Sequence, residues 1–146
     1  MAIFRGSDFA VQPPVDAVDL STYAYTFPAR GAFQPSVVVK WERVAEGTGI
    51  ASFAAGQMDQ IRAALPEVEV VSGAAARHRE WPAYVYVYSF GEASQRMRQM
   101  QRHILVPGPP RVATLTATTL EELYPQTVTL FEAVFDSFRA VEGGTA

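Results

Sequence analysis

The fold is decided by one stretch, from Trp81 to Val106, which reads WPAYVYVYSFGEASQRMRQMQRHILV. In its first half the side chains alternate, with aromatic rings at positions 84, 86, 88 and 90 and smaller residues between them. This period of two, in β-branched and aromatic residues, predicts a strand. A strand with one solvated face would carry charges on that face, so we expect both faces to be in contact with other groups.

The second half of this stretch allows two interpretations. With a period of two, Met97, Gln99 and Gln101 share one face, whereas a helical period would gather the methionines into a stripe. The loop-like residues 91–94 and the aliphatic, strand-like end of the run favour a hairpin. We therefore interpret 95–106 as the return strand of that hairpin, with methionine and glutamine on one of its faces.

The rest of the chain alternates strands, a helix, strands and a helix. Further strands are predicted near 9–11, 18–27, 36–44, 68–71 and 112–118, and helices over 50–65 and from 124 to about 139. This order predicts the α+β class, an antiparallel sheet of about six strands flanked by two main helices. Because no repeat or linker interrupts the pattern, we expect residues 1–146 to form a single domain.

The composition excludes several classes of function. The chain has 146 residues and no cysteine, so it has no disulfide framework and no thiolate chemistry. No run reaches 18 apolar residues and the first residues lack a secretory pattern, so we expect a cytoplasmic protein that is not embedded in a membrane. A net charge of −3 argues against nucleic acid as a partner, in spite of six arginines between 77 and 111.

Catalytic and metal-binding motifs are absent from the sequence. His78 and His103 have no metal-ligand spacing, and neither a nucleophile elbow nor a phosphate-binding glycine loop occurs. We therefore expect no metal, no cofactor and no enzymatic activity. His78 is interpreted as a surface loop residue, and Glu121 with Glu122 as charges at a helix start that Thr119 caps.

Two predicted strands carry an unusual face. Beside the face with Met97, Gln99 and Gln101, the strand near 18–27 places only Thr22, Ala24 and Thr26 on one side. Small side chains, thioethers and amides suit a groove that receives an apolar helix, whose polar groups the amides can bind. The alternative is that these positions face water, and the residues themselves leave both interpretations open.

Six segments together resemble a known family: TYAYTFPARG (22–31), SFAAGQMDQIRAALP (52–66), REWPAYVYVYSF (79–90), RMRQMQRHILV (96–106), LTAT (115–118) and FEAVFDSFR (131–139). They resemble the DcrB-related family with its PsbP-like fold, and within it the Eag-type chaperones of bacterial type VI secretion. The absence of a signal sequence and of a lipobox cysteine favours the cytoplasmic chaperone branch over the lipoprotein branch.

The resemblance implies a homodimeric chaperone or adaptor that binds the hydrophobic N-terminal transmembrane helices of an effector protein on the concave face of its sheet. By position, it implies a groove lined by Thr22, Ala24, Val38, Gln57, Ile61, Leu65, Met97, Gln99 and Gln101. Gln57 and one of Gln99 or Gln101 would hydrogen-bond the guest. The second hypothesis is a non-catalytic small-ligand or regulatory domain of the same fold, which predicts a closed pocket and a monomer.

Overall fold

The structure is a computed structural model that describes residues 4–5, 10–11, 22–26 and 35–140. Its strands are β1 (Phe4–Arg5), β2 (Ala10–Val11), β3 (Thr22–Thr26), β4 (Ser36–Arg43), β5 (Glu69–His78), β6 (Trp81–Phe90), β7 (Met97–Val106) and β8 (Arg111–Leu120). Its helices are α1 (Ile50–Ala64), α2 (Tyr124–Asp136) and the short 3-10 turns η1 (Ala93–Gln95) and η2 (Glu121–Leu123). The α+β class, with an antiparallel sheet and two main helices, is confirmed.

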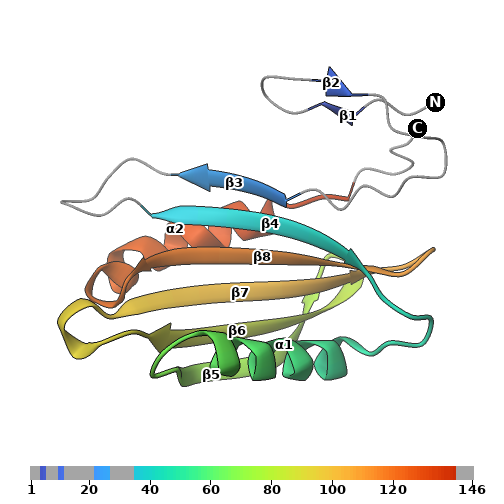
Figure 1. The fold of residues 1–146 in the computed structure, drawn as a ribbon. Coiled ribbons are helices and arrows are strands. Elements are labelled where there is room, and N and C mark those ends of the chain that lie inside the picture. The colour runs from blue at the N-terminus through green and yellow to red at the C-terminus, as the bar shows by residue number, and fades with distance from the viewer. Residues whose placement is uncertain (1–3, 6–9, 12–21, 27–34, 141–146) are drawn as a thin grey trace.

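The main sheet runs in the order β3-β4-β8-β7-β6-β5, and every neighbouring pair is antiparallel (Figure 1). Five of its strands are long, and β3 is a five-residue edge strand, so the predicted count of about six includes this short member. Strands β1 and β2 pair with each other in a separate small sheet. The predicted residues 9, 18–21 and 27 lie outside the described residues.

The β6–β7 hairpin lies inside the sheet, as the sequence predicts. Its two strands pair from Ala83 with Ile104 to Phe90 with Met97, and β7 pairs with β8 along its whole length. The helical interpretation of this segment is therefore wrong. Gly91 in the connecting turn has a φ of +97°, a backbone conformation that favours glycine.

One face of the sheet carries the hydrophobic core and is covered by α2. Phe131 and Phe135 of α2 are fully buried against Ile104, Leu115 and Ala117 of the sheet. Because residues of β8 alternate between the two faces, Thr114, Thr116 and Thr118 point away from this core. The first turn of α2 contains Pro125, which is tolerated there because that N–H needs no helical partner.

Among the described residues, α1 covers the opposite face, and it covers that face only in part. This helix lies in front of the β5–β6 side of the sheet, while α2 lies behind β8 and β4 (Figure 1). Ala54 and Met58 are its buried residues, and the ring of Phe53 meets the edge of His103 at 5.4 Å. Within the described ranges, no helix is long and apolar enough to cross a membrane.

Three local predictions are corrected. Strand β5 is ten residues long rather than four, and its last residue, His78, is buried, not a surface loop residue. Its ring nitrogens lie 2.8 Å from the Phe138 carbonyl and 3.1 Å from the Arg102 guanidinium. Thr119 does not cap a helix, since it is fully buried within β8, and the residue before α2 is Leu123.

Candidate functional site

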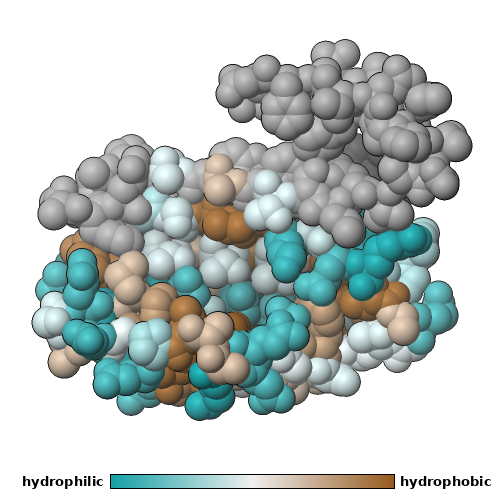
Figure 2. Space-filling model, in the orientation of Figure 1, coloured by the Kyte–Doolittle hydropathy of each residue, from teal (hydrophilic) through white to brown (hydrophobic). Residues whose placement is uncertain are grey.

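The part of the sheet that α1 leaves uncovered forms an open groove of about 310 Å³. It is lined by Val38, Lys40 and Glu42 of β4, Gln57 of α1, Gln99 and Gln101 of β7, and Thr114, Thr116 and Thr118 of β8. Figure 2 views this face of the molecule, where pale and teal polar surface surrounds a small brown apolar patch. Most of the lining residues are thus of polar types, although their methyl and methylene groups contribute much of the surface, and Val38 is the aliphatic residue among them.

The floor of the groove is a ladder of side-chain hydrogen bonds between β7 and β8. Directly opposed residues form its rungs: Gln99 with Thr118, Gln101 with Thr116, and His103 with Thr114. The amides donate from Nε2 to the threonine Oγ1 atoms at 2.9 Å and 3.1 Å, and His103 Nδ1 lies 2.9 Å from Thr114 Oγ1. The ladder fixes the orientation of the two glutamine amides, because each donates from Nε2 to a threonine hydroxyl.

The register extends these rungs across β4 to the edge strand β3. The middle rung continues from Thr116 to Val38 and then to Ala24, whose side chains are small or aliphatic. Its neighbours continue through Lys40 to Thr22, and through Ser36 to Thr26. The exposed side chains of β3 therefore extend the groove face as a low, small-residue shelf.

The middle rung contains an acceptor that the described residues do not satisfy. Gln101 is 7% exposed, its Nε2 is bound to Thr116, and its Oε1 is buried without a hydrogen-bond partner. A buried acceptor without a partner lowers stability by about 1–3 kcal/mol, so a donor that reaches this atom recovers a similar free energy. In the floor of the groove, Gln101 Oε1 shares this property with His103 Nε2, which is also buried without a partner among the described residues.

Two buried side chains of the ladder, His103 and Tyr88, are uncharged at neutral pH. Burial lowers the pKa of His103 to about 4, so its imidazole carries no charge at neutral pH. At the other end of the ladder, burial raises the pKa of Tyr88, whose hydroxyl donates to Gln99 Oε1. This leaves Lys40 and Glu42 as the titratable side chains that line the groove itself.

Four of the nine predicted site residues line the groove: Val38, Gln57, Gln99 and Gln101. Thr22 and Ala24 lie beside it on β3, opposite Lys40 and Val38. The structure does not bring the other three into the lining set. Ile61 on α1 and Leu65 directly after that helix are half-buried, and Met97 is half-buried where β7 begins, opposite Leu120.

Sequence reasoning missed five lining residues: Lys40, Glu42, Thr114, Thr116 and Thr118. A signal for the threonines was present, because they alternate with Ala113, Leu115 and Ala117 in β8. What the sequence lacked was the strand order, which places β8 between β7 and β4.

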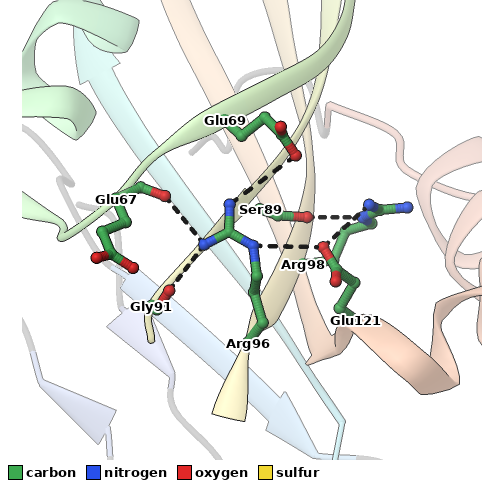
Figure 3. A network of polar contacts seen from close by, with 7 residues as sticks. All are labelled: Glu67, Glu69, Ser89, Gly91, Arg96, Arg98 and Glu121. Atoms are coloured by element: carbon green, nitrogen blue, oxygen red, sulfur yellow. Dashed lines mark hydrogen bonds and ion pairs between the residues drawn. The ribbon is translucent and has the colours of Figure 1, made fainter. Parts of the chain in front are cut away.

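Two arginines of the basic stretch, Arg96 and Arg98, make their polar contacts within the protein (Figure 3). Arg96 donates to the carbonyls of Gly91 at 2.7 Å and Glu67 at 3.1 Å, and its Nε lies 3.6 Å from Glu121. Arg98 donates to Ser89 at 2.8 Å and to Glu121 at 3.1 Å. Contact with the Ser89 hydroxyl and the two guanidinium charges lowers the pKa of Glu121. This network anchors the β6–β7 turn.

No group of three or more histidine, cysteine, aspartate or glutamate side chains that could hold a metal ion occurs in the part of the chain that the structure describes. The groove residues are amides, hydroxyls and one pair of opposite charges. Such a set can bind a partner by hydrogen bonds and close contact.

Comparison with known proteins identifies a family and a fold. The DcrB family model matches residues 12–137. A protein of unknown function from Pseudomonas aeruginosa, described as a candidate regulator, has a similar structure, with a TM-score of 0.78, 18% identity and 97% of each chain covered. No curated protein matches the chain.

Two more distant structures share the fold. The cyanobacterial PsbP protein of Synechocystis has a TM-score of 0.53 at 11% identity, over 90% of this chain and 99% of that one. The Ran-binding protein Mog1p of Saccharomyces cerevisiae has a TM-score of 0.52 at 6% identity, over 80% of this chain and 70% of that one. The PsbP-like fold implied by the resemblance is thereby confirmed.

Proposed function

The chain belongs to the DcrB family, and we propose that it is a non-catalytic binding protein whose groove holds an apolar helix of a client protein. One observation carries this proposal. The chain's own last helix covers the opposite face of the sheet, so the face with Val38, Gln99 and Gln101 has room for an outside segment.

The chemistry of the groove indicates the kind of helix that fits. Ala24, Val38 and the threonine row are short, so a helix can approach the sheet closely, and the threonine methyl groups offer apolar contact. Helices that normally lie in a bilayer associate through small residues and through serine, threonine or amide hydrogen bonds. A hydroxyl or amide donor on such a helix would satisfy Gln101 Oε1.

The resemblance to Eag-type chaperones supplies the finer form of the proposal. The client is then a type VI secretion effector with hydrophobic N-terminal helices, and the protein is a cytoplasmic homodimer that shields them before export. Each apolar side chain that leaves water contributes about 1.5–3 kcal/mol, so a few such contacts stabilise a complex against aggregation of the client.

A second candidate is a small-ligand or regulatory domain, and the charged and amide side chains that line the groove favour it. A volume of about 310 Å³ falls at the lower end of small-molecule sites. Lys40 and Glu42 place opposite charges two residues apart on one strand, which matches a zwitterion such as a free amino acid. The Pseudomonas aeruginosa protein of similar structure is itself described as a candidate regulator.

A binding assay with a model helix tests the proposal. The probe is a fluorescent 20-residue leucine–alanine peptide with a serine and glycine stripe, held in mild detergent and followed by anisotropy. We expect saturable binding, weakened more than tenfold by Ala24→Arg, which fills the shelf, and about five- to tenfold by Gln57→Ala. Gln126→Ala, an exposed glutamine on α2, is the matched control and should change nothing.

Two results would overturn the client-helix proposal. The first is a peptide that does not bind, and the second is binding that is equally strong in the wild type, Ala24→Arg and Gln57→Ala proteins. A protein that does not bind the peptide, but whose melting temperature rises in the presence of free amino acids, would support the small-ligand candidate instead.

A further inference from the structure

Among the described lining residues of the groove, the charged ones gather at one end. They are Lys40 and Glu42, and both come from β4. The register places Lys40 beside Thr114, whereas the other end of the groove is lined by the uncharged Thr118 and Gln99. Because Thr114 and Thr118 lie four residues apart on β8, the two ends are separated by roughly 13 Å.

The charges of Lys40 and Glu42 are not neutralised within the described part of the chain. Lys40 is exposed and Glu42 is half-buried, and no ion pair joins them to each other or to another described residue. The charges near the start of β7 differ, because Arg96 and Arg98 both reach the Glu121 carboxylate (Figure 3). Lys40 and Glu42 can therefore pair with charges of a molecule in the groove.

A helix in the groove would lie along the strands. The helix α1, whose Gln57 lines one side of the groove, runs in the direction of the strands, and β3 forms the border on the other side (Figure 1). A guest helix between these two borders has the same direction, so one of its ends points toward Lys40 and Glu42. The length of roughly 13 Å corresponds to about nine helical residues.

The order of the two charges favours one end of the guest helix. Lys40 lies nearer the centre of the groove, and Glu42 lies about 7 Å further out along β4. The last carbonyl groups of a helix carry a partial negative charge, which a lysine stabilises, whereas the positive N-terminus of a helix would repel it. Beyond their ends, helices that span membranes are often flanked by lysine or arginine, and such a residue would meet Glu42.

From this order we infer that the groove binds its client helix in one direction, with the C-terminus of the helix at Lys40 and a basic residue of the client paired with Glu42. The inference rests on the proposed function, because it requires a helix in the groove. The amides and hydroxyls of the floor can hydrogen-bond a helix in either direction. Lys40 and Glu42 therefore determine specificity, since they select helices that a lysine or arginine directly follows.

Two unlabelled peptides that compete with the fluorescent model helix test the inference. Both are the same leucine–alanine helix with acetylated and amidated termini, in a non-ionic detergent, and two lysines stand after the helix in one peptide and before it in the other. We expect the peptide with lysines after the helix to bind about fivefold more tightly. Because the preference is electrostatic, it should decrease when sodium chloride is raised from 0.05 to 0.5 M.

Glu42→Lys should reduce the preference to less than twofold, because it replaces the attraction to the client's lysines with repulsion. Glu132→Lys, the same change at an exposed position of α2, is the matched control and should leave the preference at about fivefold. Circular dichroism of both variants verifies that their fold is unchanged.

Cross-linking tests the direction of the helix. A photoreactive benzoylphenylalanine in the last turn of the peptide should cross-link to residues 40–44, and the same group in the first turn should not.

Equal affinities of the two peptides, or an unchanged preference in Glu42→Lys, would overturn the inference while the proposed function stands. Cross-links from the first turn instead of the last would overturn the assigned direction. If neither peptide displaces the model helix, the inference is wrong, and if the model helix itself does not bind, the proposed function is wrong as well.

Discussion

The two faces of the main sheet differ in the side chains that they carry. The face under α2 is a continuous apolar core that includes Ile104, Leu115 and Phe135. The face toward the groove is built from the same strands, yet it carries threonines and glutamines joined by hydrogen bonds. In β8 the two kinds of surface alternate residue by residue.

This difference indicates which residues hold the fold together and which are available for binding. Apolar burial stabilises in proportion to the area removed from water, so the α2 face supplies most of the folding free energy. Hydrogen bonds contribute less to the free energy of folding, because each one replaces hydrogen bonds to water. The ladder therefore contributes more to the orientation of its side chains than to the stability of the fold. Substitutions on either face test this difference.

Phe135→Ala should produce the largest effect on stability. Phe135 is fully buried and its ring also stacks under the Arg102 guanidinium at 5.5 Å. We expect a loss of about 3–5 kcal/mol in urea unfolding, from lost burial and from the cavity that remains. Phe53→Ala on the groove side, where the ring is half-buried, should cost less than half as much. Equal losses would mean that the two faces do not differ in this way.

His103 should make stability depend on pH. Burial lowers its pKa to about 4 in the folded chain, against 6.5 in the unfolded chain. Below pH 6.5 the unfolded chain binds a proton that the folded chain excludes, so stability falls as the pH drops toward 4. Between pH 7.5 and 5 this contribution is about 2 kcal/mol.

The variant His103→Gln keeps a polar partner for Thr114 and removes the titration. Urea unfolding at pH 7.5 and pH 5 should therefore show a smaller loss in the variant than in the wild-type protein. The same loss in both proteins would contradict the prediction, since another group would then cause the pH dependence.

Thr116→Val should have the smallest effect, and it separates stability from binding. It removes the acceptor of Gln101 Nε2 and leaves a buried donor unpaired, at a cost of about 1–2 kcal/mol. Adding Gln101→Met should recover most of this loss, because no polar group then remains unsatisfied. We expect the double variant to bind the model helix at least tenfold more weakly. A double variant that keeps full affinity would show that the ladder is not needed for binding.

Much of the fold could be predicted from local patterns. The alternation in Trp81–Val106 predicted the β6–β7 hairpin, and the apolar period in 124–139 predicted α2 with Phe131 and Phe135 facing inward. The predictions failed where a distant contact decided the outcome. His78 is buried because Arg102 and the end of α2 surround its ring, and neither lies near it in the sequence.

The candidate site was predicted only in part, because local patterns determine its strand faces and contacts between distant segments determine the rest. The face of Gln99 and Gln101 follows from the period of β7, and the small side of β3 follows from its own alternation. Ile61 and Leu65 share the stripe of α1 with Gln57, but only the position of the helix over the sheet determines which of them reaches the groove.

Which residues of each strand share a face follows from the sequence alone, because the side-chain period of a strand is local. That period puts methionine and glutamine on one face of β7 and Thr22, Ala24 and Thr26 on one face of β3. Only the tertiary structure decided that β8 lies between β7 and β4, and that α2 covers the apolar face while α1 stops short of the other. Strand order and helix placement depend on contacts between segments far apart in the chain, which no local period records.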